Sequence, residues 1–131
     1  MIKFPETFHE LDCEGIGYPG VVVTLWANPP AGHEPAPLGA GLKDLPKLLS
    51  GAVEFYRESA AIVRAVELPE AFGGPERIEI GTAHDLYELE RRPGFDPLIV
   101  AWALREWRLH RLDWMVAAAK NVGSASGTQS G

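Results

Sequence analysis

The clearest hydrophobic run near the N-terminus is Val21-Val22-Val23-Thr24-Leu25-Trp26. Valine, threonine and tryptophan in succession favour a β-strand, and the near-continuous apolarity predicts that both faces of this strand are covered. Asn28-Pro29-Pro30 should end the strand, because proline cannot donate a hydrogen bond to a β-ladder. Shorter strands fit residues 2–4 and 8–11, and the segment 27–42, rich in proline and glycine, is predicted to be a loop.

The middle of the chain changes from helical to strand-like spacing. Asp44 can cap a helix that begins at Leu45, and apolar residues then recur every three or four positions as far as Val63. Residues 61–68 fit either the end of this helix or a strand, and the pattern leaves that choice open. The Gly73-Gly74-Pro75 turn favours a hairpin in which about 62–68 pairs with 76–80.

Two further helices are predicted from their N-terminal residues. Thr82 followed by Asp85 resembles a capping box with Asp in place of the usual Glu, and predicts a short helix that ends near 91–94. Asp96-Pro97 is the best helix start in the chain, since a capping acid precedes a proline at the first helical position. A helix should run from there to about Lys120.

These elements predict one α+β domain over residues 1–122, in which a small antiparallel sheet is packed by two or three helices and the C-terminal helix is long. The helices near 45–60 and 97–120 are expected to cover the sheet, and the small polar residues of 123–131 predict a disordered tail. The length of 131 residues suits a single domain, and 46% apolar and 23% charged residues are typical of a soluble globular protein.

The predicted C-terminal helix has two apolar stripes, although a helix at the surface of a domain needs only one. The stripes follow from a rotation of about 100° per residue along a helix. One stripe consists of Leu98, Trp102, Leu109, Leu112 and Val116. The opposite stripe consists of Val100, Leu104, Trp107, Trp114 and Met115. We predict that one stripe packs on the domain's own core and the other contacts a second chain. Burial of both stripes within the domain is the alternative.

The predicted partner-binding residues follow from these stripes, because buried aromatic and aliphatic side chains supply most of the affinity of protein interfaces. They are Trp102, Leu104, Trp107, Leu109, Trp114 and Met115. A homo-oligomer is one form that such a contact would take.

Charge and hydropathy narrow the class of protein. A net charge of −6 argues against binding to nucleic acid or to an anionic membrane. No apolar run approaches the roughly 20 residues that span a bilayer, and the N-terminal residues lack the apolar core of a signal peptide. The single Cys13 cannot form an internal disulfide, which fits a reducing compartment. A cytoplasmic protein is therefore expected.

No motif indicates catalysis or a bound metal. The four histidines lie far apart in the sequence and form no HxH or HExxH pattern. The enzymatic alternative is a pocket that brings together Cys13, His84 and Tyr87 with nearby acids. We predict instead a non-enzymatic binding protein with no catalytic residue, no metal and no cofactor.

The order of these features resembles that of the small tail assembly chaperones of long-tailed bacteriophages. The resembling pieces cover roughly residues 18–115. They are the strand 21–26 with Asn28-Pro29-Pro30, the stretch 62–68 before Gly73-Gly74, and the capped helices after Thr82 and Asp96.

The resemblance implies a function in the cytoplasm of a bacterial host. Such chaperones bind the hydrophobic, helical tape measure protein, keep it soluble before the tail tube polymerises around it, and are absent from the finished virion. In many phages a programmed frameshift near the end of the first chaperone makes a longer version, and the tail 123–131 would suit such a junction. A phage structural or connector subunit, or a small adaptor protein, is the alternative function.

Overall fold

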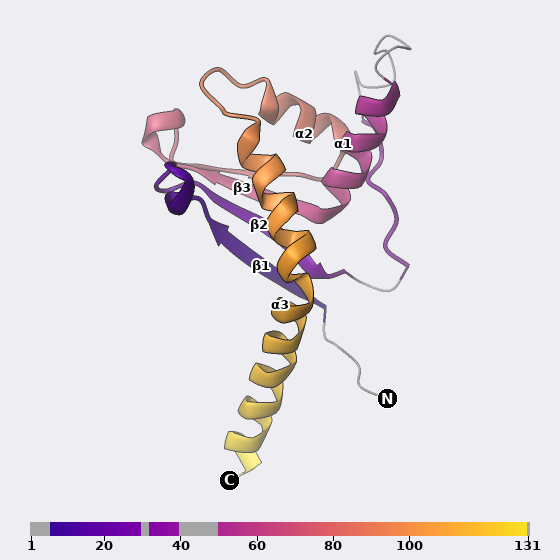
Figure 1. Cartoon of the computed structure of the whole chain (residues 1–131), viewed down its shortest axis with the longest axis vertical. Helices are drawn as coiled ribbons and strands as arrows, with labels where there is room; N and C mark the ends of the chain where they lie inside the picture. The colour runs from indigo at the N-terminus through magenta and orange to yellow at the C-terminus, as the bar shows by residue number, and fades with distance from the viewer. Residues whose placement is uncertain (1–5, 30–31, 40–49, 131) are drawn as a thin grey trace.

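The computed structural model describes residues 6–29, 32–39 and 50–130 (Figure 1). Within these residues, four strands form one antiparallel sheet in the order β1-β2-β3-β4, and three α-helices accompany it. The strands are β1 (Thr7–Asp12), β2 (Val22–Asn28), β3 (Val63–Leu68) and β4 (Glu76–Glu79), and the helices are α1 (Ser50–Ile62), α2 (Ala83–Glu90) and α3 (Leu98–Ser130). The predicted α+β class with a long C-terminal helix is confirmed.

Strand β2 is the buried centre of the sheet. It pairs with β1 on one side and β3 on the other, so that Val23 lies opposite both Leu11 and Val66. The side chains of Val23, Leu25 and Ala27 have no solvent exposure. The predicted strand and its end at Asn28-Pro29 are confirmed; β1 contains the predicted strand 8–11, whereas residues 2–4 lie outside the described residues.

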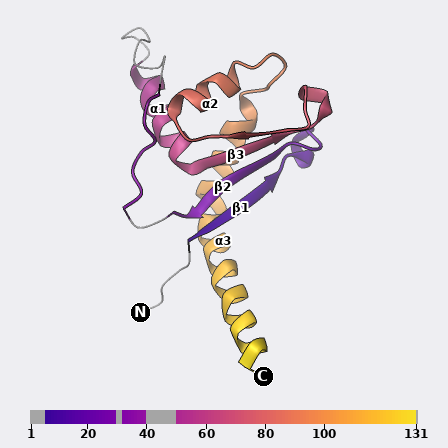
Figure 2. The same cartoon turned by 180° about the vertical axis from the view of Figure 1, so that it is seen from behind.

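Helix α3 covers one face of the sheet, and its C-terminal half extends beyond the sheet (Figure 1). Its buried residues Ile99, Val100 and Ala103 share one hydrophobic core with Val23 and Leu25 of β2. In the view from behind, β1, β2 and β3 pass in front of α3 (Figure 2). Both faces of β2 are covered, as predicted, since Thr24 on this second face is only 6% exposed, but among the described residues no helix supplies the cover there.

Side chains of the sheet itself shield this second face. The rings of Phe8 and Trp26 lie 4.1 Å apart between centroids, and the guanidinium of Arg64 lies 5.3 Å from the Trp26 ring. A cation held over aromatic rings covers apolar surface with its aliphatic stem while it keeps its charge hydrated. A near-continuous apolar strand therefore needs a helix on one side only.

Residues 61–68, which the pattern left open, divide between two elements. Helix α1 ends at Ile62 and β3 begins at Val63. Because β3 pairs with both β2 and β4, non-local hydrogen bonds outweigh the local helical pattern there. The predicted hairpin is confirmed by the pairing of Leu68 with Glu76. Its turn requires glycine at position 74, because a Cβ there would lie 2.2 Å from the carbonyl oxygen of Leu68.

The two predicted helix starts are confirmed by their hydrogen bonds. The Thr82 hydroxyl accepts a hydrogen bond from the Asp85 N–H at 3.1 Å, and the Asp85 carboxylate accepts one from the Thr82 N–H at 2.9 Å. Asp96 accepts a hydrogen bond from the Leu98 N–H at 2.9 Å. The predicted start of α1 near Asp44 lies outside the described residues.

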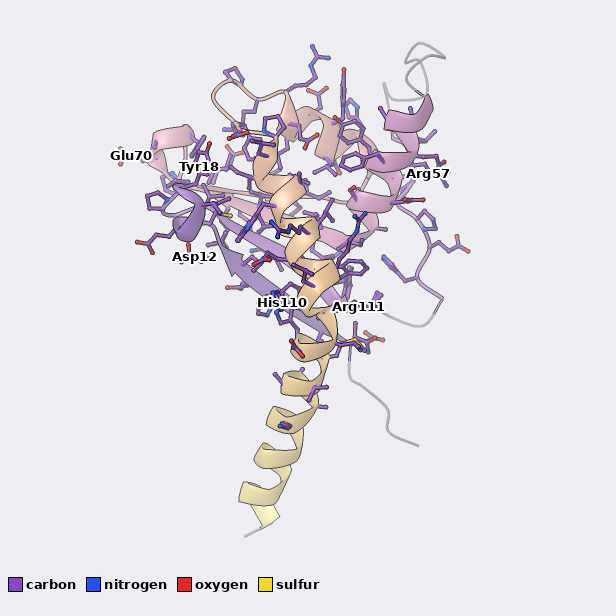
Figure 3. The ribbon with its side chains drawn as sticks, viewed as in Figure 1. Asp12, Tyr18, Arg57, Glu70, His110 and Arg111 are labelled. Carbon is purple, nitrogen blue, oxygen red and sulfur yellow. The ribbon has the colours of Figure 1, made fainter. Side chains whose placement is uncertain are left out.

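Asp96 also joins the start of α3 to the rest of the fold. Its second carboxylate oxygen accepts a hydrogen bond from the hydroxyl of Tyr18, which follows η1 (Glu14–Ile16). This hydrogen bond, together with that from Leu98, lowers the pKa of Asp96. The centroid of the Tyr18 ring lies 6.0 Å from that of Phe72 in η4 (Glu70–Phe72), at the end of the sheet where Figure 3 labels Tyr18 and Glu70.

The described part of the predicted loop, residues 32–39, is docked on the helices. The N–H groups of Ala83 and His84 donate to the carbonyls of Pro37 and Leu38 at 2.8 and 2.9 Å, and Ala36 is buried. At the other end of the chain, α3 runs on past the predicted end at Lys120, and disorder of 123–131 stays a prediction. Over the described residues, no helix has the length and apolarity needed to span a membrane.

Candidate functional site

The inner face of α3 anchors the helix to the sheet. The indole N–H of Trp107 donates to the carbonyl of Trp26 at 2.7 Å, and the Arg111 guanidinium donates to the carbonyl of Ala27 at 2.8 Å. One helical turn further on, Trp114 stacks on His9 of β1 with 4.0 Å between ring centroids. Burial lowers the pKa of His9, although Glu10 opposes this shift. The indole of Trp107 and the guanidinium of Arg111 thus donate hydrogen bonds to carbonyls at the end of β2, beyond the part of β2 that pairs with β3.

These contacts place most of the predicted partner-binding residues on the inner face. Leu104 and Met115 are buried, with 7% and 9% exposure. Trp102, Trp107 and Trp114 are partly buried and pack against the core. Leu109, with 59% exposure, is the one predicted residue that points fully outward.

The opposite face of α3 is apolar and exposed. Leu98, Leu109 and Leu112 are 69%, 59% and 70% exposed, and Val116 is 41% exposed. Burial of both stripes within the domain, the alternative of the sequence prediction, is therefore not what the structure shows. The sequence prediction distinguished the two stripes correctly but selected site residues from both of them.

The outward residues of α3 have the spacing of a coiled-coil seam. Steps of four and three residues alternate along the helix, which is the arrangement that lets one helix pack along another. We call this set the outer seam; it consists of Leu98, Trp102, Arg105, Leu109, Leu112, Val116 and Ala119. Trp102, which packs partly against the core, and Ala119 are half-buried, and the other members are exposed. A surface of this spacing suits a helical partner better than an extended peptide.

A shallow groove of about 300 Å³ runs beside the outer seam where α1 meets α3. It is lined by Phe55 of α1 and by Leu104, Arg105, Arg108 and Leu109 of α3. Phe55 is 42% exposed and extends the apolar surface from α3 onto α1. Phe55 could not be identified from the sequence, because its contribution depends on where α1 lies beside α3.

Charged residues flank the outer seam on both sides. Arg108 lies on one flank, whereas Glu106, Asp113 and Lys120 lie on the other. His110 stands 3.9 Å from Glu106 and 3.7 Å from Asp113, and the Asp113 side chain is 83% exposed. Arg105 and Arg108 have no ionic partner within the described part of the chain. Figure 3 shows His110 and Arg111 on the length of α3 that crosses the end of the sheet.

Comparisons with known proteins supply no relative to guide the assignment. No protein-family model, no curated protein and no solved structure matches this chain. The site must therefore be interpreted from its own residues.

Of the residues in the enzymatic alternative, Cys13 does not offer a reactive thiol in this structure. Cys13 is fully buried, and burial together with the Asp12 charge raises the pKa of its thiol to about 11. A thiol with this pKa is protonated at neutral pH and is a poor nucleophile. His84 lies 3.8 Å from Glu88 on α2. Among the described residues, no group of three acids, histidines or cysteines could hold a metal ion.

A second hollow, of about 310 Å³, lies between the end of β2 and α3. Trp26 lines it from β2, Trp107 and Arg111 line it from α3, and His33 lines it from the docked loop. The His33 ring is hydrogen-bonded to the carbonyl of Ala61 at 2.8 Å. His33 lies in the segment predicted to be a loop, and this contact helps to hold that loop against α1.

The contact between α1 and α2 contains a partly buried carboxyl group whose ionisation should affect stability. Burial raises the pKa of Glu90, although a hydrogen bond from Tyr56 opposes the shift. The folded state therefore holds the Glu90 proton up to a higher pH than the unfolded state does. The free energy of unfolding should fall as pH rises from about 4.3, the ordinary pKa of glutamate, through the raised pKa of Glu90.

Urea unfolding at a series of pH values, compared between the wild type and Glu90→Gln, measures this contribution. The variant carries no titrating group there, so the difference in stability between the two proteins should change over this pH window. A difference that stays constant with pH would show that Glu90 titrates equally in both states.

Proposed function

We propose that this chain is a non-enzymatic protein-binding domain that holds a helical segment of another protein on the outer seam of α3. The observation that carries the proposal is the exposure of the seam leucines, of which Leu112 is 70% and Leu98 is 69% exposed. Several large apolar side chains exposed along one face of a helix indicate an interaction site. Alternating steps of four and three residues select a helix as the partner.

The binding of a helical client agrees with the function that the resemblance to tail assembly chaperones implies. A client such as the tape measure protein is long, helical and hydrophobic, and it needs an apolar cover until assembly begins. The net charge of −6 would keep the complex of chaperone and client soluble. The exposed Arg105 within the seam and Arg108 beside it would pair with acids of the client helix. Such charge pairs determine the orientation of the client more than its affinity.

Co-expression with a helical fragment of a tape measure protein tests this function. The wild-type chain should raise the soluble yield of the fragment and should copurify with it. Leu112→Glu should abolish both effects, because it places a charge in the centre of the seam. The matched control is Phe8→Glu, which changes another exposed apolar residue on the far face of the sheet.

Two results would contradict the proposal. One is a soluble yield of the fragment that is the same with and without the wild-type chain. The other is the chain in stoichiometric amounts in purified phage particles, detected by mass spectrometry, which would favour a structural subunit.

A further inference from the structure

The outer seam has the residues needed to pair with itself. Its apolar positions are Leu98, Trp102, Leu109, Leu112 and Val116, with a single charged residue, Arg105, among them. One polar residue in an otherwise apolar seam is the usual device that fixes the register and number of helices at some cost in stability. The question that the flanking charges can answer is the direction of the second helix.

In a parallel pair, each residue on one flank faces the residue five positions later on the opposite flank of the second helix. Arg108 then faces Asp113 of the second copy, and the symmetric contact is formed as well. Arg105 lies next to Glu106 of the second copy, which offsets the repulsion between the two Arg105 side chains. Among the described residues, His110 is the only basic side chain within 4 Å of either acid, and Asp113, whose side chain is 83% exposed, is able to turn toward such a partner.

An antiparallel pair would set each flank against itself. In the antiparallel registers that bury both Leu109 and Leu112, an acid of one copy faces an acid of the other copy. The acid is Glu106 or Asp113 in each copy. Arg108 would likewise lie on a flank that carries no acid. Like charges placed opposite each other weaken a helix pair and select against it. The flanking charges therefore favour the parallel arrangement.

We propose that, in the absence of a client, a second copy of this chain covers the outer seam, with the two α3 helices parallel about a twofold axis. The inference rests on the proposed function, because it assigns the same face of α3 to an interface. Each α3 carries its sheet on the side away from the seam, so the two sheets stand on opposite sides of the helix pair. A client helix would then compete with the second copy for the seam.

Sedimentation velocity over a hundredfold range of concentration tests the dimer. The wild type should change from monomer to dimer, and Leu112→Glu should remain monomeric while Phe8→Glu still dimerises. Far-UV circular dichroism checks that each variant is folded. A wild type that is monomeric throughout, or a folded Leu112→Glu that dimerises like the wild type, overturns the inference.

A charge exchange tests the contact that specifies direction. Arg108→Asp and Asp113→Arg should each weaken the dimer by several fold, because each places like charges opposite one another. The double variant restores opposite charges and should recover the wild-type dissociation constant. Because both residues are exposed, these variants keep the core intact even if Leu112→Glu does not fold. Single and double variants that all dimerise as the wild type does would overturn the assigned contact.

Cysteine cross-linking distinguishes parallel from antiparallel helices. In a parallel pair, Leu109→Cys and Val116→Cys should both form interchain disulfides on mild oxidation. The reason is that each position of one helix lies beside the same position of the second helix. In an antiparallel pair, only the position nearest the twofold axis can do so. The buried Cys13 can be retained, since its raised pKa keeps its thiol unreactive.

The outcomes separate this inference from the proposed function. A monomeric chain that still raises the soluble yield of a tape measure fragment refutes the dimer and leaves the function standing. A parallel dimer that has no effect on the fragment refutes the chaperone function and leaves the dimer standing.

Discussion

Leu104→Ala is expected to lower the free energy of unfolding by about 2–5 kcal/mol, whereas Leu112→Ala on the same helix should change it by less than about 0.5 kcal/mol. The two variants delete the same atoms from helix-interior positions of α3. Leu104 is 7% exposed against the core, and Leu112 is 70% exposed. Because helix propensity changes equally, the difference between the two values reports the burial of Leu104.

Urea unfolding at a protein concentration where the wild type is monomeric measures both values. That condition matters, since a dimer through the outer seam would add stability that depends on Leu112. Equal losses in the two variants under monomeric conditions would contradict the assigned inner and outer faces of α3.

Trp107→Ala is expected to destabilise the fold by about 3 kcal/mol, at the lower end of the range for buried aromatic residues because Trp107 is only partly buried. The variant loses the packing of the indole and the hydrogen bond of 2.7 Å to the Trp26 carbonyl. It also removes the ring over which the Arg111 guanidinium lies, at 5.1 Å from the ring centroid.

Trp107→Phe separates the packing from the hydrogen bond. It keeps an aromatic ring but leaves the Trp26 carbonyl without this donor, which should cost about 1–2 kcal/mol. Thermal and urea unfolding of both variants provide the measurement. A Trp107→Phe protein as stable as the wild type would show that the hydrogen bond contributes nothing net.

The signals that predicted structure correctly from the sequence were local ones. Thr82 with Asp85, and Asp96 before proline, mark helix starts because capping is a hydrogen bond between residues two or three positions apart. The strand at β2 could be predicted because β-branched and apolar residues follow one another without interruption. Such features need no knowledge of the rest of the fold.

The features that the sequence could not settle depend on contacts between distant residues. Residues 63–68 form a strand because β2 and β4 lie on either side of them. Periodicity showed that α3 has two apolar stripes, but it could not show which stripe the sheet covers. The choice follows from donors such as Trp107 and Arg111, which reach carbonyls at the end of β2.

The two outermost strands of the sheet also restrict how copies of this chain can associate. Strand β4 has only four residues, and Glu76, Arg77 and Glu79 are charged; β1 carries Glu10 and Asp12 on exposed positions. Short and charged edge strands discourage the addition of further strands from other molecules, which is the first step toward amyloid-like fibres. High concentrations of this chain should therefore be tolerated without fibrillar aggregation.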